Sequence, residues 1–153
     1  MAQNCSLART RPHGLLLHLL GYCQSTKRTG QDVSLAVQND LFAALLSHWK
    51  LNNPEVVAHD FGGATSLRAH YLNAVQYRRL TPIDPVAVAP WGSPFVNHIR
   101  HHEAAFTGLP ADAHEALLAA YLQGAAHNPL SQDAQSLYQQ PRTGADGQAA
   151  FYR

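Results

Sequence analysis

Asp60 is the residue whose neighbours most restrict what it could do chemically. It follows a short β-branched run, residues 55–59 (EVVAH), and is followed within three positions by two glycines. A reactive residue on a tight strand-to-helix turn needs small residues two positions before and after it, because the backbones crowd there, and Ala58 and Gly62 meet this requirement. A carboxylate in that setting could attack a carbon electrophile and form an ester with the protein.

The predicted helix after this turn would assist such a carboxylate. Its N-terminus favours an anion through the helix dipole and the unpaired N–H groups of the first turn. The backbone N–H of Phe61, the residue after the nucleophile, would serve as an oxyanion donor. The alternative is that Asp60 only caps the helix starting at Gly62. Small residues on both sides of Asp60 are not needed for a cap, so the pattern favours the nucleophile.

The elements around Asp60 predict an α/β fold with a parallel sheet. We expect a helix, a buried strand, a helix and a strand over residues 32–49, 55–59, 64–77 and 79–83. Asp32 or Ser34 can cap the first helix. The second helix has an apolar side made of Leu67, Tyr71, Leu72 and Val75.

The sequence patterns at the two ends of the chain predict different structures. Residues 1–13 show no periodicity, Leu15–Leu20 would be a short buried strand or one helical turn, and residues 21–30 form a polar loop. Further helices are predicted over residues 95–106, 112–126, 131–140 and from 147 to the end. The predicted domains are a poorly ordered segment (1–17), a partial core (18–89) and a helical region (90–153).

Residues 56–63 (VVAHDFGG) resemble the His-Asp-Trp-Gly turn of the haloalkane dehalogenase and epoxide hydrolase branch of the α/β-hydrolases. Residues 21–25 (GYCQS) resemble that family's upstream Gly-x-Gly-x-Ser loop, with Cys23 in place of the second glycine and His18 where an acidic residue is common. The resemblance covers about residues 18–153. It implies a partial α/β-hydrolase sheet and makes the helical region a cap over the active site.

The resemblance also implies roles for particular residues. Asp60 would be the nucleophile, the Phe61 backbone N–H an oxyanion donor, and Asp84, which ends the next predicted strand, the acid of the triad. Asp84 before Pro85 is equally a common turn pair. Phe61 replaces a tryptophan whose indole N–H binds the departing halide, which favours epoxides over haloalkanes.

Two parts of the family's machinery have no clear counterpart. His13-Gly14 is not preceded by a strand pattern, so we do not assign it to the family's His-Gly oxyanion loop. No residue before Arg153 matches the catalytic histidine that follows the last strand of the fold. We therefore expect the chain to be the middle of a longer protein and inactive by itself.

Other polar and aromatic residues suit structural roles. His98 and His102 have the spacing of two metal ligands on one helix face, but no third ligand has a matching spacing, so a polar helix face is the better interpretation. His59 alternates away from Asp60 along its strand. No metal or other cofactor is expected. The aromatic residues of the helical region would pack between helices or line an apolar pocket: Trp91, Phe95, Phe106, Tyr121, Tyr138, Phe151 and Tyr152.

Composition excludes several classes of partner. The 153 residues are 46% hydrophobic and only 14% charged, with a net charge of +1, so no basic field is available for nucleic acid. No apolar run approaches the length of a membrane span. Two cysteines, Cys5 and Cys23, do not make a disulfide framework, and we expect a reducing, cytoplasmic setting. The oligomeric state stays open.

The sequence therefore predicts a hydrolase with an Asp nucleophile. Its substrate would be a small apolar carbon electrophile, such as an epoxide, a haloalkane or an ester-like molecule. Two alternatives stay open: a non-catalytic, truncated product of a hydrolase gene, and a helical interaction module formed by residues 90–153.

Overall fold

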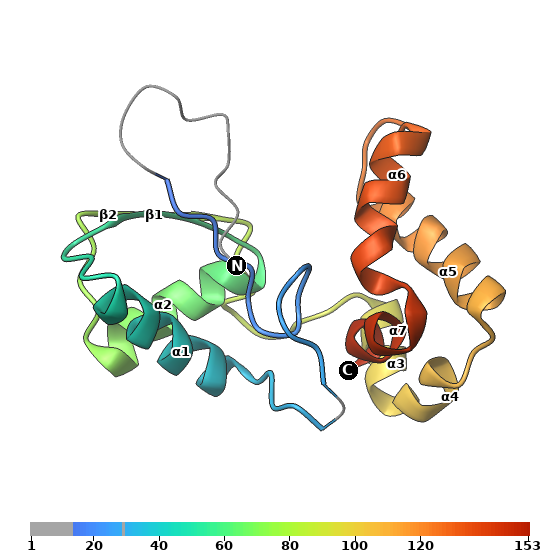
Figure 1. Ribbon diagram of the computed structural model, residues 1–153, viewed down its shortest axis with the longest axis horizontal. Helices are drawn as coiled ribbons and strands as arrows, with labels where there is room; N and C mark the ends of the chain where they lie inside the picture. The colour runs from blue at the N-terminus through green and yellow to red at the C-terminus, as the bar shows by residue number, and fades with distance from the viewer. Residues whose placement is uncertain (1–13, 29) are drawn as a thin grey trace. The chain divides into compact units, whose positions relative to one another are not determined.

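The computed structural model describes residues 14–28 and 30–153. Asp32–Ser93 form one compact unit, and Pro94–Arg153 form another with the described residues that precede Asp32. We call them the sheet unit and the helical unit (Figure 1). The predicted disorder of residues 1–17 falls largely outside the described residues, and the predicted domain boundaries stay predictions. No described helix combines the length and apolar character needed to cross a membrane.

The sheet unit contains two parallel strands with the predicted bounds. β1 (Glu55–His59) pairs with β2 (Arg79–Ile83), and the register sets Val57 opposite Thr81 and His59 opposite Ile83. These two strands form the whole sheet in the described part of the chain. The predicted parallel sheet is confirmed.

Helix α1 (Leu35–His48) directly follows a capping serine, as the sequence indicates. The Ser34 hydroxyl accepts a hydrogen bond from the Val37 N–H at 3.5 Å, and Asp32 Oδ1 accepts from the Ser34 N–H at 2.8 Å. Ser34 is therefore the cap, and Asp32 supports it. The helix buries Phe42 and Leu46.

Helix α2 (Phe61–Asn73) starts directly after Asp60, earlier than the predicted start at Ala64. Its buried residues are mostly small: Gly63, Ala64, Thr65, Ser66 and Ala69. The predicted apolar side is not the packed side, since Tyr71 is 79% exposed and Leu72 62% exposed. Small side chains allow a neighbouring helix to approach closely, and α1 packs against α2.

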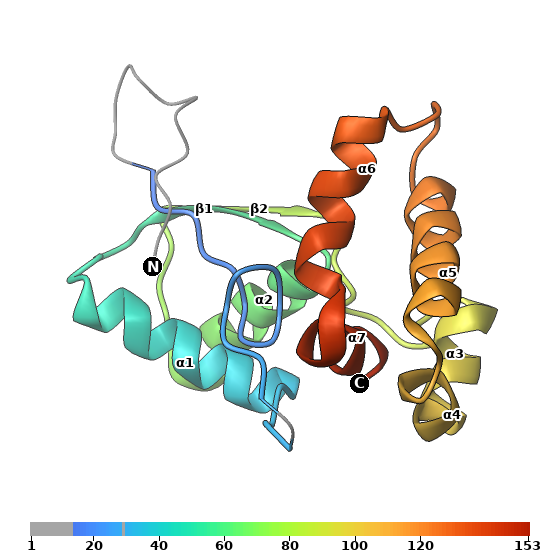
Figure 2. The ribbon, with the colours of Figure 1, turned by 45° about the vertical axis from the view of Figure 1, so that its right-hand side comes forward.

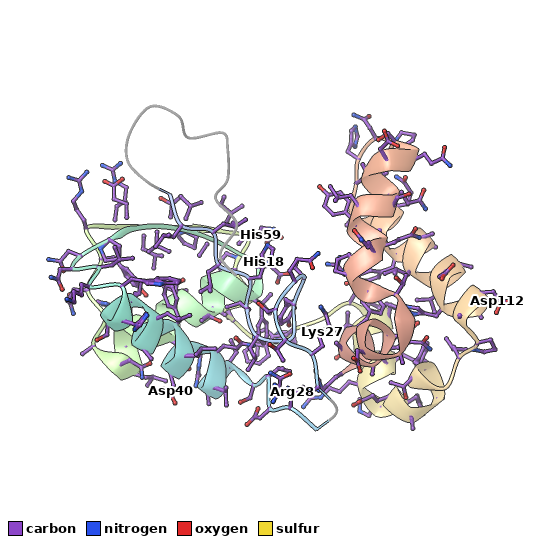
Figure 3. The ribbon with its side chains drawn as sticks, in the orientation of Figure 1. His18, Lys27, Arg28, Asp40, His59 and Asp112 are labelled. Atoms are coloured by element: carbon purple, nitrogen blue, oxygen red, sulfur yellow. The ribbon has the colours of Figure 1, made fainter. Side chains whose placement is uncertain are left out.

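A polar network joins α1 to α2. The Asn39 side-chain amide donates to Asn73 Oδ1 at 2.8 Å, and its own oxygen accepts from Arg68 Nε at 3.1 Å. Asn73 in turn donates to Asp40 Oδ1 at 2.7 Å. Asn39 is only 2% exposed, so these bonds offset the cost of burying its amide. The network accounts for a helix pair with few large apolar contacts. Asp40 lies on the outer side of α1 (Figure 3).

Within Asp32–Ser93, helices cover one face of the sheet and leave the other bare. Both α1 and α2 lie on the same side of the two strands (Figures 1 and 2). Ala58 is buried and Val56 half-buried, whereas Val57, which points to the opposite face, is 72% exposed. The prediction of a fully buried β1 is therefore wrong for one of its two faces.

The helical unit contains α3 (Pro94–His101), α4 (Glu103–Thr107), α5 (Ala111–Gly124), α6 (Gln132–Gln139), the 3₁₀ helix η1 (Gln140–Arg142) and α7 (Gly144–Tyr152). α5 and α6 lie side by side (Figure 2). The single helix predicted over residues 95–106 is two helices, because His102 leaves the helical conformation with φ −133°. The last helix starts at Gly144 rather than at Gly147.

A buried histidine joins three elements of the helical unit. His114 on α5 is 1% exposed; its Nε2 lies 2.9 Å from the Arg142 carbonyl oxygen and its Nδ1 lies 2.8 Å from the Tyr152 hydroxyl. A carbonyl can only accept, so Nε2 carries the proton, and in the neutral ring Nδ1 accepts from the Tyr152 O–H. Burial raises the pKa of Tyr152, which keeps this hydroxyl a donor.

Gln148 on α7 binds the backbone at the C-terminal end of α4. Gln148 Nε2 lies within hydrogen-bond distance of three carbonyl oxygens, those of Phe106, Thr107 and Leu109, and the shortest distance is 2.9 Å to Leu109. A Cβ at Gly147 would lie 2.7 Å from the Arg142 carbonyl carbon. Only glycine at position 147 allows α7 to lie this close to the backbone of Arg142.

Residues 14–28, 30 and 31 form irregular structure and turns. Leu15–Leu20 contain neither the strand nor the full helical turn predicted for them. In the turn that follows, the Tyr22 N–H donates to the Leu19 carbonyl at 3.0 Å. The Ser25 hydroxyl donates to the His18 carbonyl at 2.7 Å, and the Lys27 ammonium donates to the Cys23 carbonyl. Figure 3 labels His18 and Lys27 on this loop. The loop predicted over 21–30 is confirmed in its described part.

Tyr77, between α2 and β2, generates a pH prediction. Its hydroxyl donates to the Ser66 carbonyl at 2.9 Å, and burial raises its pKa from 10 to about 12. A raised pKa means that the folded chain holds this proton more tightly than the unfolded chain. The contribution to stability is complete below pH 10 and is lost as the pH rises through about 12. Tyr77→Phe should reduce this alkaline loss of stability, measured by denaturant unfolding across that range.

Tyr71 is the matched control, because it is a tyrosine of the same unit with a well-exposed ring. Tyr71→Phe should leave the alkaline profile unchanged. Equal effects of the two substitutions would show that Tyr77 is not a source of the pH dependence.

Candidate functional site

The backbone of Asp60 belongs to the sheet and to the helix at once. Its N–H donates to the Ile83 carbonyl at 3.1 Å and so extends the β1–β2 ladder. Its carbonyl accepts from the N–H groups of Gly63 and Ala64, at 3.0 and 3.3 Å, which opens α2. Only Asp60 separates strand from helix, so the turn is as tight as the sequence indicates.

Asp60 has a backbone conformation that few side chains adopt. Its φ is 52° and its ψ −121°. A non-glycine residue held there costs about 1–3 kcal/mol, which the surrounding contacts must offset. Its side chain makes no capping hydrogen bond to α2 and is exposed. The carboxylate is therefore presented at the helix N-terminus rather than used as a cap, contrary to the alternative interpretation.

The crowding of the turn falls at Gly63 and not at Gly62. A Cβ on Gly62 would meet no atom within 4 Å, so the expectation that this position must be small is wrong in the described structure. A Cβ on Gly63 would lie 2.6 Å from the Pro85 Cβ. The cause is the segment after β2, which folds back so that the Val86 N–H donates to the Asp60 carbonyl at 3.3 Å.

Asp84 lies at the same end of the sheet as Asp60. It follows Ile83, the partner of His59, so the two aspartates occupy equivalent positions after adjacent parallel strands. Asp84 is exposed and also has a left-handed conformation, with φ 43°. The structure thus brings together two of the predicted site residues. Phe61, half-buried, follows Asp60 as the first residue of α2.

The other polar candidates are His59, on the strand before the turn, and a histidine pair of the helical unit. His59 is exposed on the bare face of β1 (Figure 3), as alternation predicts. In the helical unit, the rings of His98 and His102 are 4.6 Å apart, and His98 also contacts the edge of Phe106. Among the described residues, no group of three or more His, Cys, Asp or Glu side chains could hold a metal ion.

Most of the predicted aromatic residues pack against one another. Phe95, Phe106, Tyr121, Phe151 and Tyr152 form a chain of ring contacts with centroids 5.0–6.2 Å apart. Trp91 and Tyr138 are exposed instead. A hollow of about 470 Å³ is lined by Leu20, Thr26, Arg28, Gly30 and Gln31, and none of these residues belongs to the Asp60 turn. Packing between helices is therefore the role that these contacts support.

Known proteins match this chain at the level of structure. No family model and no curated protein matches it. A solved α/β hydrolase fold protein from Burkholderia ambifaria is 58% identical, with a TM-score of 0.84 over 88% of this chain and 50% of that one. The chain has part of an α/β-hydrolase fold. It spans about half the length of this neighbour.

Two more distant structures support the same fold. The haloalkane dehalogenase DatA from Agrobacterium tumefaciens C58 is 22% identical, with a TM-score of 0.56 over 88% of this chain and 47% of that one. A probable hydrolytic enzyme from Pseudomonas aeruginosa PAO1 is 19% identical, with a TM-score of 0.57 over 88% of this chain and 44% of that one. At these identities the likeness concerns the fold alone.

Two substitutions test the crowding at Gly63. Gly63→Ala should destabilise the sheet unit by about 1–3 kcal/mol, because the added methyl would collide with Pro85. Gly62→Ala is the control on the same turn of helix and should be neutral or stabilising by up to about 1 kcal/mol. Denaturant midpoints measure both. Equal losses at the two positions would contradict the assignment of the crowding to Gly63.

A second pair of substitutions tests the strain at Asp60. Asp60→Gly should be more stable than Asp60→Asn by about 1 kcal/mol, because both remove the charge but only glycine relieves the backbone. Ser34→Gly is the contrast at a true cap and should lose a few tenths of a kcal/mol. An Asp60→Gly variant less stable than Asp60→Asn would show that the turn is not strained.

Proposed function

We propose that this chain carries the nucleophile of an α/β-type hydrolase, and that Asp60 attacks a small apolar carbon electrophile such as an epoxide, a haloalkane or an ester-like molecule. One observation carries the proposal: an exposed carboxylate is held in a costly backbone conformation at the junction of β1 and α2, with no capping bond to explain it. Strain of this kind persists where the surrounding structure maintains it, and it gathers at active sites.

The proposed reaction begins with one displacement. An Asp60 oxygen forms a bond to carbon, and an ester remains on the protein. With an epoxide, the carbon–oxygen bond breaks and the freed oxygen takes a proton from water; with a haloalkane, the carbon–halogen bond breaks and halide leaves. The N-terminus of α2 favours the carboxylate charge before attack. The Phe61 backbone N–H is the proposed donor to the oxyanion that forms when water cleaves the ester.

The side chain after the nucleophile guides the choice of substrate. Phe61 has no N–H or O–H group to bind a departing halide. Opening an epoxide releases no halide, so the lack of a halide-binding donor at this position matters less for an epoxide. Among the proposed substrates, the sequence at this turn therefore favours epoxides.

Asp84 is the proposed acid that would orient a catalytic histidine. Its place after β2, beside Asp60 in register, sets it at the end of the sheet where such a group is needed. The helical unit is the proposed cap over the site. The histidine that activates water is assigned to no residue of this chain, so we expect the ester on Asp60 to persist.

This expectation makes the first half-reaction directly observable. Incubation of the chain with a small reactive epoxide such as styrene oxide should add the mass of one epoxide molecule, and peptide mapping should place the ester on Asp60. Asp60→Asn should abolish the adduct, and Asp84→Asn should retain it. An adduct that survives Asp60→Asn would remove Asp60 from the mechanism, and repeated product release by the chain alone would reveal a base among its own residues.

A further inference from the structure

Two histidines approach each other at the junction of α3 and α4. His98 lies on α3, and His102 is the N-cap residue of α4, with no capping bond from its side chain. The ring centroids are 4.6 Å apart and the ring planes cross at 52°, so the rings are close without stacking. Both side chains are exposed in the described structure. Neither has a part in the chemistry proposed for Asp60.

The backbone keeps the two rings on one side of the chain. Residues four positions apart on a helix are neighbours on its surface. The chain leaves the helical conformation at His102, but the His102 N–H still donates to the Ile99 carbonyl at 2.9 Å. This bond extends the path of α3 by one residue. The four-residue spacing therefore brings the rings together even though the helix has ended.

The His98 ring is also held by an aromatic contact. Its centroid lies 5.8 Å from that of Phe106, with the ring planes at 89°. Phe106 is half-buried and in turn contacts Phe95 and Tyr152. A side chain that is already held by packing loses less conformational freedom when it binds a ligand. His98 is therefore partly preorganised for binding.

The ring nitrogens of the pair are available to a ligand. Within the described part of the chain, neither ring makes a hydrogen bond. His101 is different, because its Nδ1 lies 2.7 Å from the Asn97 carbonyl oxygen and must donate to it. A neutral imidazole with a free lone pair is the commonest metal ligand in proteins. His98 and His102 thus suit metal binding better than His101 does.

The distance between the rings suits two ligands of one metal ion. A bond from zinc to an imidazole nitrogen is about 2.0–2.1 Å long, which puts the ring centroid about 3.2 Å from the ion. Two such rings have centroids about 4.5 Å apart at a right angle and about 5.2 Å apart at the tetrahedral angle. The observed 4.6 Å lies near the right angle. Tetragonal ions such as Ni²⁺ and Cu²⁺ have ligands at right angles, so the geometry favours them over Zn²⁺.

We propose that His98 and His102 form a two-histidine site for a divalent transition-metal ion of the Ni²⁺ and Cu²⁺ type. No group of three His, Cys, Asp or Glu ligands occurs among the described residues, so the remaining coordination positions are assigned to water. The missing third ligand, which favours a polar helix face in the sequence, limits the affinity of the site and does not exclude it. The ion joins α3 to α4 across the break at His102.

The test is to titrate the full chain with NiCl₂ and to follow binding by isothermal titration calorimetry. We expect one Ni²⁺ at the strongest site of each chain. His98→Asn and His102→Asn should each weaken this binding at least about tenfold, since loss of a residue that only supports a metal ligand already costs about 10–100-fold. His101→Asn is the matched control between them and should bind like the wild type.

Two outcomes of the titration would overturn the site. One is Ni²⁺ affinity that is unchanged when both His98 and His102 are replaced. The other is an equal loss of affinity in His101→Asn. The replaced side chains are exposed, so all variants should have the wild-type denaturant midpoint without metal. This measurement separates a loss of ligands from a loss of folding.

Hydrogen exchange tests whether the ion joins the two helices. The N–H groups of Ala105 and Phe106 donate to the His102 carbonyl and open α4. Saturating Ni²⁺ should slow their exchange in the wild type and in His101→Asn, but not in the variant that lacks both His98 and His102. Equal slowing in that double variant would show that the ion acts elsewhere and would overturn the proposal.

The metal site does not depend on the proposed function. Asp60→Asn should bind Ni²⁺ like the wild type and give no epoxide adduct. Ni²⁺ binding without an adduct on the wild-type chain would contradict the nucleophile and leave the metal site standing. An adduct without Ni²⁺ binding would do the reverse.

Discussion

The structure of the sheet unit depends on the turn at Asp60, where a single residue links β1 to α2. The N–H of Asp60 closes the β1–β2 ladder while its carbonyl opens α2, so the strand and the helix share one residue. A shared residue cannot relax toward either element, which is why it holds a left-handed φ of 52°. The Val86 N–H donates to the same carbonyl, and Pro85 fills the space beside Gly63. Contacts from the segment after β2 therefore hold the turn in place. The exposed carboxylate follows from these backbone constraints and not from any bond that its side chain makes.

Much of this arrangement could be predicted from local sequence. A β-branched run between Pro54 and a glycine pair indicates β1, and the turn pair Asp84-Pro85 ends β2, so both strands have their predicted bounds. Ser34 caps α1 because its hydroxyl lies where the first turn needs an acceptor. These features depend on neighbours a few residues away, and the pattern contains the necessary information.

Features that depend on distant neighbours could not be predicted in the same way. The apolar pattern of α2 indicates which side chains are apolar, but α1 approaches through Asn39, and the matching face of α2 is made of small residues such as Ala69. Pro85 looked only like a turn residue, and its contact with Gly63 requires the three-dimensional path of the chain after β2. His114 gave no signal, because a single histidine in an amphipathic helix has no spacing that marks it as buried.

The proposed chemistry divides between what the turn supplies and what must come from elsewhere. The position and strain of Asp60, the proposed nucleophile, are set within Asp32–Ser93, by contacts among β1, α2 and the segment after β2. Activation of water and the shape of a substrate pocket need groups that approach the exposed carboxylate from other elements. The turn can therefore hold the proposed nucleophile in place even where the groups for the rest of the catalytic cycle are absent. On this view the strain at Asp60 is a property of the turn itself, and it should be present whether or not a base ever reaches the ester.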